Sequence, residues 1–63
     1  MNDKPKCKLI GENGNIFNLV GIAQRTLKKN GLEEQGKEMI KRIAESQSYD
    51  QALVIIGEYV EIV

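Results

Sequence analysis

Alternating polar and apolar residues near the start of the chain predict a strand. Residues 1–5 are polar and contain the only proline, so we expect a frayed tail there. Residues 6–10 alternate, with Cys7 and Leu9 on one face and two lysines on the other, as in a half-buried strand. The pattern predicts a single small domain over residues 6–63 that begins with this strand.

A helical pattern follows a short segment rich in glycine and asparagine. Residues 11–15 read Gly-Glu-Asn-Gly-Asn, and apolar residues then recur at helical spacing up to a basic end and an Asn-Gly pair. Such a pair is typical of a left-handed helix stop. We therefore expect a helix over residues 16–29 with Asn15 as its N-cap. Gly21 costs this helix up to about 1 kcal/mol relative to alanine, which indicates a close backbone approach there.

The Asn13-Gly14 pair leaves a second interpretation of this region open. Asn-Gly is a strong signal for a two-residue β-hairpin, and β-forming residues flank it on both sides. The helix is favoured because apolar spacing continues to Leu27, whereas strict alternation fails at Ile16 and Phe17.

Residues 32–46 predict a second helix. Its narrow apolar stripe consists of Leu32, Gly36, Met39, Ile40 and Ile43. Charged pairs at i,i+4 spacing would stabilise its solvent side, and these pairs are Glu33–Lys37 and Glu38–Arg42.

A third helix and a closing strand complete the chain. Ser48 and Gln51 match a capping box, so the third helix begins there, and Gly57 is expected to end it. Its expected inner face consists of Tyr49, Ala52, Leu53 and Ile56. Residues 59–63 are β-branched and aromatic, which favours a strand. The order β-α-α-α-β predicts a small, mostly helical α+β domain in which the chain ends form a two-stranded ribbon of undetermined direction.

Composition narrows the chemistry. The 63 residues include no histidine and one cysteine, so the commonest general base and the Cys-rich zinc site are both excluded. We expect no enzymatic activity, no metal and no cofactor. Nine basic and nine acidic residues balance, which argues against non-specific nucleic-acid binding. The apolar runs are too short to cross a bilayer, so a cytoplasmic protein is expected.

Small size also predicts self-association. A domain of about 60 residues buries only roughly 60% of its unfolded surface, and chains below about 70–80 residues often gain stability by oligomerising. Basic residues predominate before residue 30 and acidic residues after it, which suits complementary faces within or between chains.

The turn at residues 11–15 is the clearest candidate for ligand binding. Free amides at a helix N-terminus can hold an anion such as a nucleotide phosphate. Glu12 opposes this, and the third glycine of a dinucleotide fingerprint is missing, so a plain turn and cap is the competing interpretation. Lys6 and Lys8 would either grip phosphate or an acidic partner, or discourage aggregation at a strand edge. Cys7 lies between them but is expected on the apolar face, where a thiol is inert.

The segment from Lys8 to Gly21, with the sequence Lys-Leu-Ile-Gly-Glu-Asn-Gly-Asn-Ile-Phe-Asn-Leu-Val-Gly, resembles a group of short uncharacterised proteins encoded by tailed phages and integrated mobile elements. In that group a strand ends in a Gly-x-Asp/Asn-Gly-Asn turn, followed by a small or apolar residue, Phe and a Gly-containing helix. Residues 48–50 and 59–62 also match, whereas residues 30–45 match only in character. The resemblance implies a phage or prophage setting, and no site residues transfer with it.

Two functional expectations follow. The first is a non-enzymatic interaction protein of phage or mobile-element origin that forms a homo-oligomer and modulates or inhibits a host protein, such as a defence protein. The second is an oligomeric sponge that sequesters a nucleotide signal at helix N-termini. For either, the expected binding residues are Lys6, Lys8, Asn13, Gly14 and Asn15.

Overall fold

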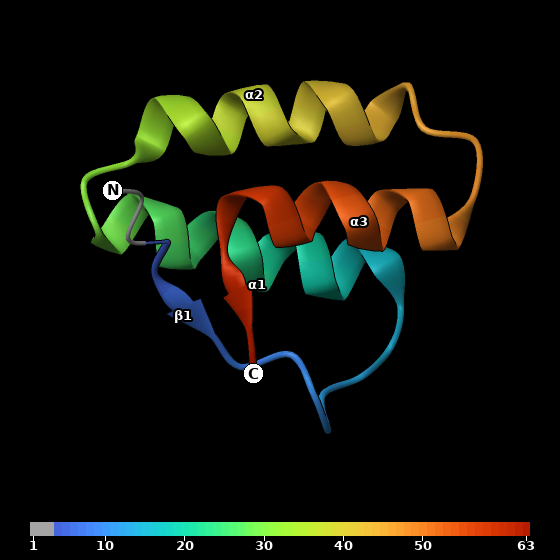
Figure 1. The fold of residues 1–63 in the computed structure, drawn as a ribbon, viewed down its shortest axis with the longest axis horizontal. Coiled ribbons are helices and arrows are strands. Elements are labelled where there is room, and N and C mark those ends of the chain that lie inside the picture. The colour runs from blue at the N-terminus through green and yellow to red at the C-terminus, as the bar shows by residue number, and fades with distance from the viewer. Residues whose placement is uncertain (1–3) are drawn as a thin grey trace.

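The structure is a computed structural model that describes residues 4–63. Strand β1 (Lys6–Cys7) leads into helices α1 (Ile16–Lys29), α2 (Glu33–Ala44) and α3 (Tyr49–Tyr59), and strand β2 (Glu61–Ile62) follows (Figure 1). This order confirms the predicted β-α-α-α-β domain, with a two-stranded sheet made by the chain ends. Of the expected tail, residues 1–3 lie outside the described residues. Lys4 Nζ donates to the Gly57 carbonyl at 2.8 Å, and the Pro5 carbonyl accepts from Glu61 N at 2.9 Å.

Helix α1 has the predicted bounds because both of its ends are capped. Asn15 Oδ1 accepts from Phe17 N at 2.9 Å and satisfies an amide that the helix itself leaves without a partner. At the other end Gly31 adopts a φ of 74°, and its amide donates to the Lys28 carbonyl at 3.1 Å. Leu32 N donates to the Leu27 carbonyl at 2.8 Å, which completes a Schellman motif. The hairpin alternative at Asn13-Gly14 is therefore wrong.

The capping box of α3 forms with a shifted partner. Ser48 Oγ accepts from Gln51 N at 3.1 Å, as predicted. Gln51 Oε1 accepts from Gln47 N at 2.6 Å, one residue before the cap instead of at the cap itself. The side chains of Ser48 and Gln51 thus each accept a hydrogen bond from a backbone amide at the start of α3.

The expectation that Gly57 ends α3 is wrong. The helix continues to Tyr59, and Val60 N still donates to the Ile56 carbonyl at 3.0 Å before the chain becomes extended at a φ of −135°. A glycine ends a helix when it adopts a positive φ, and Gly57 does not do so.

The two strands pair in parallel, with Lys6 opposite Glu61 and Cys7 opposite Ile62. They are shorter than predicted because the chain turns away after Leu9: the Leu9 and Ile10 amides both donate to the Val63 carbonyl, and Glu12 N donates back to the Leu9 carbonyl at 3.1 Å.

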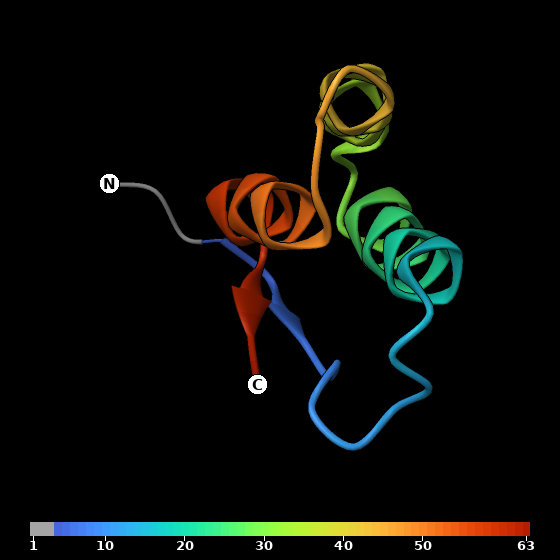
Figure 2. The same cartoon turned by 90° about the vertical axis from the view of Figure 1, so that its right-hand side faces the viewer.

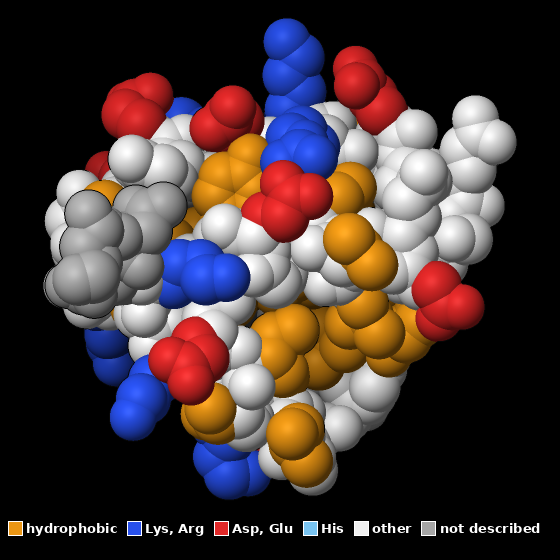
Figure 3. All heavy atoms as spheres, viewed as in Figure 1, with side chains coloured by type: hydrophobic (Ala, Val, Ile, Leu, Met, Phe, Trp, Pro, Cys, Tyr) orange, Lys and Arg blue, Asp and Glu red, His pale blue; other side chains and the backbone are white. Residues whose placement is uncertain are grey.

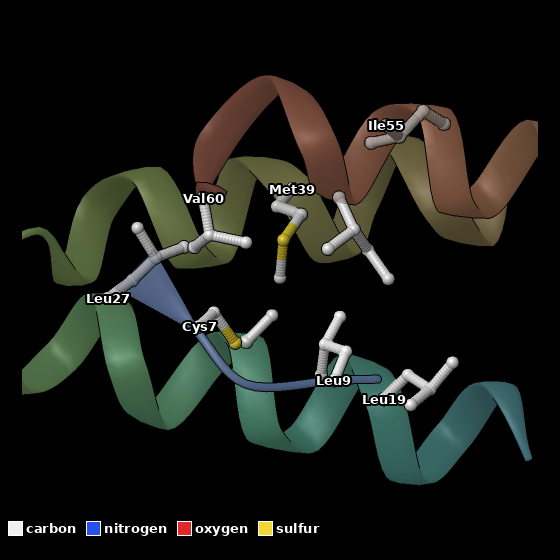
Figure 4. Close-up of a cluster of buried hydrophobic side chains, with 9 residues drawn as sticks. Cys7, Leu9, Leu19, Leu27, Met39, Ile55 and Val60 are labelled. Atoms are coloured by element: carbon white, nitrogen blue, oxygen red, sulfur yellow. The ribbon is translucent and has the colours of Figure 1, made fainter. Parts of the chain in front are cut away.

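The ribbon lies against α1 and α3, and α2 lies on the far side of the helix pair (Figure 2). Strand β1 and the three helices supply buried side chains to one core (Figure 4), and Ile62 of β2 packs against it. Its buried members are Cys7, Leu9, Leu19, Ala23, Leu27, Met39, Ile55, Ile56 and Val60. Cys7 is buried, with 1% of its surface exposed, as the strand pattern predicted, and its Sγ lies 3.5 Å from the Thr26 hydroxyl.

Two sequence expectations about α1 and α2 are corrected by the packing. A Cβ on Gly21 would meet only the end of the Arg25 side chain, at 3.6 Å, so no backbone approaches closely there. The expected i,i+4 pairs of α2 are replaced by Lys37–Glu34, at 3.8 Å, and by a longer-range pair between Arg42 and Glu58 of α3.

Candidate interaction surface

The predicted lysines lie on the outer face of the ribbon. Lys6 and Lys8 are both exposed, whereas Cys7 and Leu9, which alternate with them, are buried. Lys8 bends back over the turn, where its Nζ donates to the Ile10 carbonyl at 3.0 Å and lies 3.7 Å from Glu12 Oε2. Its charge is therefore partly engaged within the turn.

The predicted turn residues are held by a local network of hydrogen bonds. Asn13 Oδ1 accepts from Asn15 N at 2.9 Å, and the Asn13 carbonyl accepts from Asn18 Nδ2 at 2.9 Å. The Gly14 carbonyl accepts from the Tyr49 hydroxyl, which joins the turn to the first turn of α3. The asparagine oxygens thus serve to shape the turn and to cap α1.

Tyr49 occupies a different place from the one expected. Its alignment with Ala52, Leu53 and Ile56 predicted an inward-facing ring, but the side chain is 46% exposed. The first turn of α3 lies beside the 11–15 turn, so the ring covers this turn instead of entering the core. The structure thereby brings Tyr49 together with Asn13, Gly14 and Asn15.

Two apolar grooves meet at Tyr49. The first has a volume of about 240 Å³ and lies between the ribbon, α1 and α3. It is lined by Leu9, Ile10, Gly14, Leu19, Tyr49, Leu53 and Ile62. The second has a volume of about 540 Å³ and lies at the end of the bundle where α1 and α3 begin and α2 ends. It is lined by Ile16, Phe17, Ile43, Ala44, Ser46, Gln47, Ser48, Tyr49 and Ala52.

We call the surface formed by both grooves the Tyr49 face. No charged side chain is present among its described lining residues. It carries three large apolar side chains that are mostly or half exposed: Phe17 at 84%, Ile10 at 69% and Tyr49 at 46%. On the side drawn in Figure 3, hydrophobic side chains gather toward the lower centre and right, whereas charged side chains surround them and crowd the top and left. Tyr49 lines both grooves, so their uncharged surfaces adjoin there. Adjoining apolar surface of this kind marks an interaction site more often than a scattered apolar residue does.

A second polar cluster connects α2 to the end of α3. Arg42 Nη1 donates to Glu58 Oε1 at 2.6 Å and to the Tyr59 hydroxyl at 3.2 Å. The hydrogen bond from Arg42 holds the pKa of the Glu58 carboxyl below its usual value, although partial burial opposes this. The same bond, followed by that to Tyr59, raises the pKa of Arg42. Both side chains are about half exposed, so this ion pair joins α2 to α3 with only a modest contribution to stability.

Within residues 4–63, no three acidic or cysteine side chains come together in a way that could hold a metal ion. None of the helices in this part of the chain has the length and apolar character needed to cross a membrane. Comparison with known proteins adds no assignment: no protein-family model, curated protein or solved structure matches the chain significantly.

Sequence reasoning missed the Tyr49 face. The signal that could have found it is the position of Phe17, which follows the cap Asn15 by two residues and falls outside the helical stripe of Leu19, Ala23 and Leu27. A large aromatic residue off the apolar stripe, in a chain with only three aromatics, is an interface candidate.

Proposed function

We propose that this protein is a non-enzymatic interaction protein whose Tyr49 face binds a protein chain. One observation carries the proposal: Phe17 is 84% exposed on the rim of an uncharged groove at the end of the helix bundle. When another chain covers a phenyl ring and the apolar groove beside it, apolar surface is removed from water, and this stabilises the complex. Aromatic anchors in apolar pockets are also the side chains that contribute most to binding energy in protein interfaces.

The remaining chemistry of the chain supports a binding role. The chain has no histidine, and its one thiol is enclosed with 1% of its surface exposed. The pKa shifts of Arg42 and Glu58 are explained by the ion pair between α2 and α3, so they need no catalytic explanation. The resemblance to short phage-encoded proteins adds a setting in which the partner or target is a host protein, such as a defence protein.

The nucleotide-sequestering alternative draws no support from the described contacts of the turn. The asparagine oxygens accept hydrogen bonds from backbone amides of the turn and of α1, and Lys8 lies against Glu12. A nucleotide phosphate that binds Lys8 would have to displace the Glu12 carboxylate or lie beside it, where the two negative charges would repel each other. Calorimetric titration with linear and cyclic nucleotides tests this alternative directly, and saturable binding that is weakened by Lys8→Glu would restore it.

Site-specific photo-crosslinking tests the proposed function. A photoreactive phenylalanine analogue is placed at Phe17 in one variant and at Val54 in the control, and both are expressed in bacterial cells and irradiated. Val54 is also exposed, at 64%, but does not line either groove. We expect a protein adduct from position 17 and none from position 54. Absence of any adduct at position 17, with the protein folded and abundant, would contradict the proposal.

A further inference from the structure

The character of the Tyr49 face narrows the choice of partner. Two further grooves carry charges: Lys4 and Glu58 line one, and Arg25, Lys28 and Glu33 line the other. The Tyr49 face is lined only by apolar and neutral polar side chains. In a two-fold symmetric interface, residues near the axis meet their own copies, so a charge there would face a like charge. An uncharged face avoids this repulsion and is suited to meeting itself.

The shape of the face is also self-complementary. Phe17 projects from the first turn of α1 on one side of the larger groove, and the small side chains of Ala44 and Ala52 lie in the wall of the same groove. A two-fold interface needs both the projecting group and its receptor on one surface, because each copy supplies both. From this geometry we infer that a second copy of this chain covers the Tyr49 face, with the Phe17 ring of each copy seated in the larger groove of the other.

The size of the molecule is compatible with such a dimer. A specific interface of standard size removes about 800 Å² from each partner. That is about a fifth of the 4420 Å² accessible surface of this chain, and it corresponds to roughly one face of a molecule measuring 28 × 25 × 19 Å. The two grooves reach from Ile62 in the ribbon to Ala44 at the end of α2 and would form the apolar part of such an interface. Dimerisation would also supplement a core that is small for an independent domain.

This inference rests on the proposed function and names the occupant of the same surface. Lys6 and Lys8 line neither groove, although Lys8 Nζ reaches the carbonyl of Ile10 at the edge of the smaller one.

Sedimentation velocity and native mass spectrometry over a concentration series test the dimer. We expect the unmodified protein to dimerise at micromolar concentration. Because each copy supplies one Phe17 ring, Phe17→Ser removes two aromatic hot spots from the dimer and should weaken it by roughly 1000-fold. The matched variant Val54→Ser removes a similarly exposed apolar side chain outside the grooves and should leave the dimerisation constant unchanged. Circular dichroism verifies that both variants remain folded, as their exposed positions lead us to expect.

A mixed-disulfide experiment tests the arrangement. Phe17→Cys protein is mixed with Ala44→Cys protein under mild oxidation, and Cys7 is retained because it is enclosed in the core. We expect a heterodimer linked between positions 17 and 44, and little of it when Val54→Cys replaces Phe17→Cys. A dimer that forms but does not link these positions would overturn the proposed arrangement.

The outcomes separate this inference from the function on which it rests. If the protein stays monomeric at several hundred micromolar, and position 17 crosslinks to a different protein in cells, the second copy is excluded and the binding function stands. If it stays monomeric and position 17 crosslinks to nothing, both are overturned. A dimer that Phe17→Ser and Val54→Ser weaken equally would exclude the Tyr49 face as its interface.

Discussion

At the residue scale, two glycines differ in whether glycine or alanine would be the more stable residue. Glycine is favoured at position 31, where φ is positive, and alanine at position 21, which is helical. Gly31 adopts a φ of 74° in the Schellman motif after α1, a region that other residues enter at a cost of roughly 1–2 kcal/mol. Gly21 is helical and half-buried, and a methyl group there would meet only the mobile end of Arg25 at 3.6 Å. The conformation required at each position therefore decides what a side chain would do.

Alanine substitution at each glycine tests this difference. We expect Gly31→Ala to lower the free energy of unfolding by about 1 kcal/mol, because alanine is strained at positive φ. Gly21→Ala should raise it by up to about 1 kcal/mol, because alanine is the better helix former. Chemical denaturation of both variants measures these changes. Stabilisation by Gly31→Ala would show that the left-handed cap does not form in solution.

Another residue-scale prediction concerns the ion pair between Arg42 and Glu58. Because the pKa of Glu58 is lower in the folded chain than in the unfolded one, the carboxylate stabilises the fold above its ordinary pKa of about 4.3. This contribution is lost as the pH falls through the lower folded value. Glu58→Gln should therefore be less stable than the unmodified protein at neutral pH, and the two unfolding curves should converge in acid.

The control is Glu38→Gln, because Glu38 is exposed in the middle of α2, away from the helix ends and outside the ion pairs found within residues 4–63. This variant should follow the unmodified protein across the whole pH range. If the difference between Glu58→Gln and the unmodified protein persisted unchanged below pH 3, it would have to come from packing and not from charge.

At the element scale, the start of α3 depends on the Ser48 cap. The hydroxyl satisfies the amide of Gln51 at 3.1 Å, and the segment before it is an irregular connection from α2. Ser48→Ala should cost about 1 kcal/mol of stability in thermal or urea denaturation, whereas Ser48→Asp should cost only a few tenths because aspartate also caps. Equal losses in the two variants would indicate that packing, not capping, fixes this end of the helix.

The elements also show where sequence reasoning succeeds. The bounds of α1 were predictable because its signals are local: a capping asparagine, one apolar stripe and an Asn-Gly end. The end of α3 was not, since Gly57 remains helical and the chain leaves the helix only where Val60 joins the core and Glu61 pairs with β1. Strand length and direction depend on the same tertiary pairing, which no local pattern records.

In the candidate site, too, local patterns predicted some residues correctly, whereas tertiary contacts decided the positions of others. Asn15 was identified correctly as a cap because capping depends on neighbouring residues, and Lys6 and Lys8 were placed outward by alternation. Tyr49 was misplaced because its spacing fits the inner face of α3, and only the proximity of the 11–15 turn shows that the ring covers that turn. The Tyr49 face combines residues from all three helices and the ribbon, so its two grooves could not be predicted from periodicity.

At the scale of the whole molecule, folding and association should be linked. A chain of 63 residues is expected to have a folding free energy of only about 3–9 kcal/mol. A second copy that binds only the folded chain adds to this by mass action. Above the dissociation constant, a tenfold rise in total concentration stabilises a dimer by about 1.4 kcal/mol, or about 0.7 kcal/mol for each chain.

Thermal unfolding across protein concentrations reveals this linkage. For a domain of this size, about 0.7 kcal/mol corresponds to a rise in Tm of about 3–6 °C for each tenfold increase in concentration. We expect this slope for the unmodified protein and for Val54→Ser. Phe17→Ser should show a much flatter dependence over the same range, because its dimer dissociates at these concentrations. A Tm independent of concentration in all three proteins would mean that the chain folds without a second copy, and Phe17 would then be exposed in the free protein, available to a different partner.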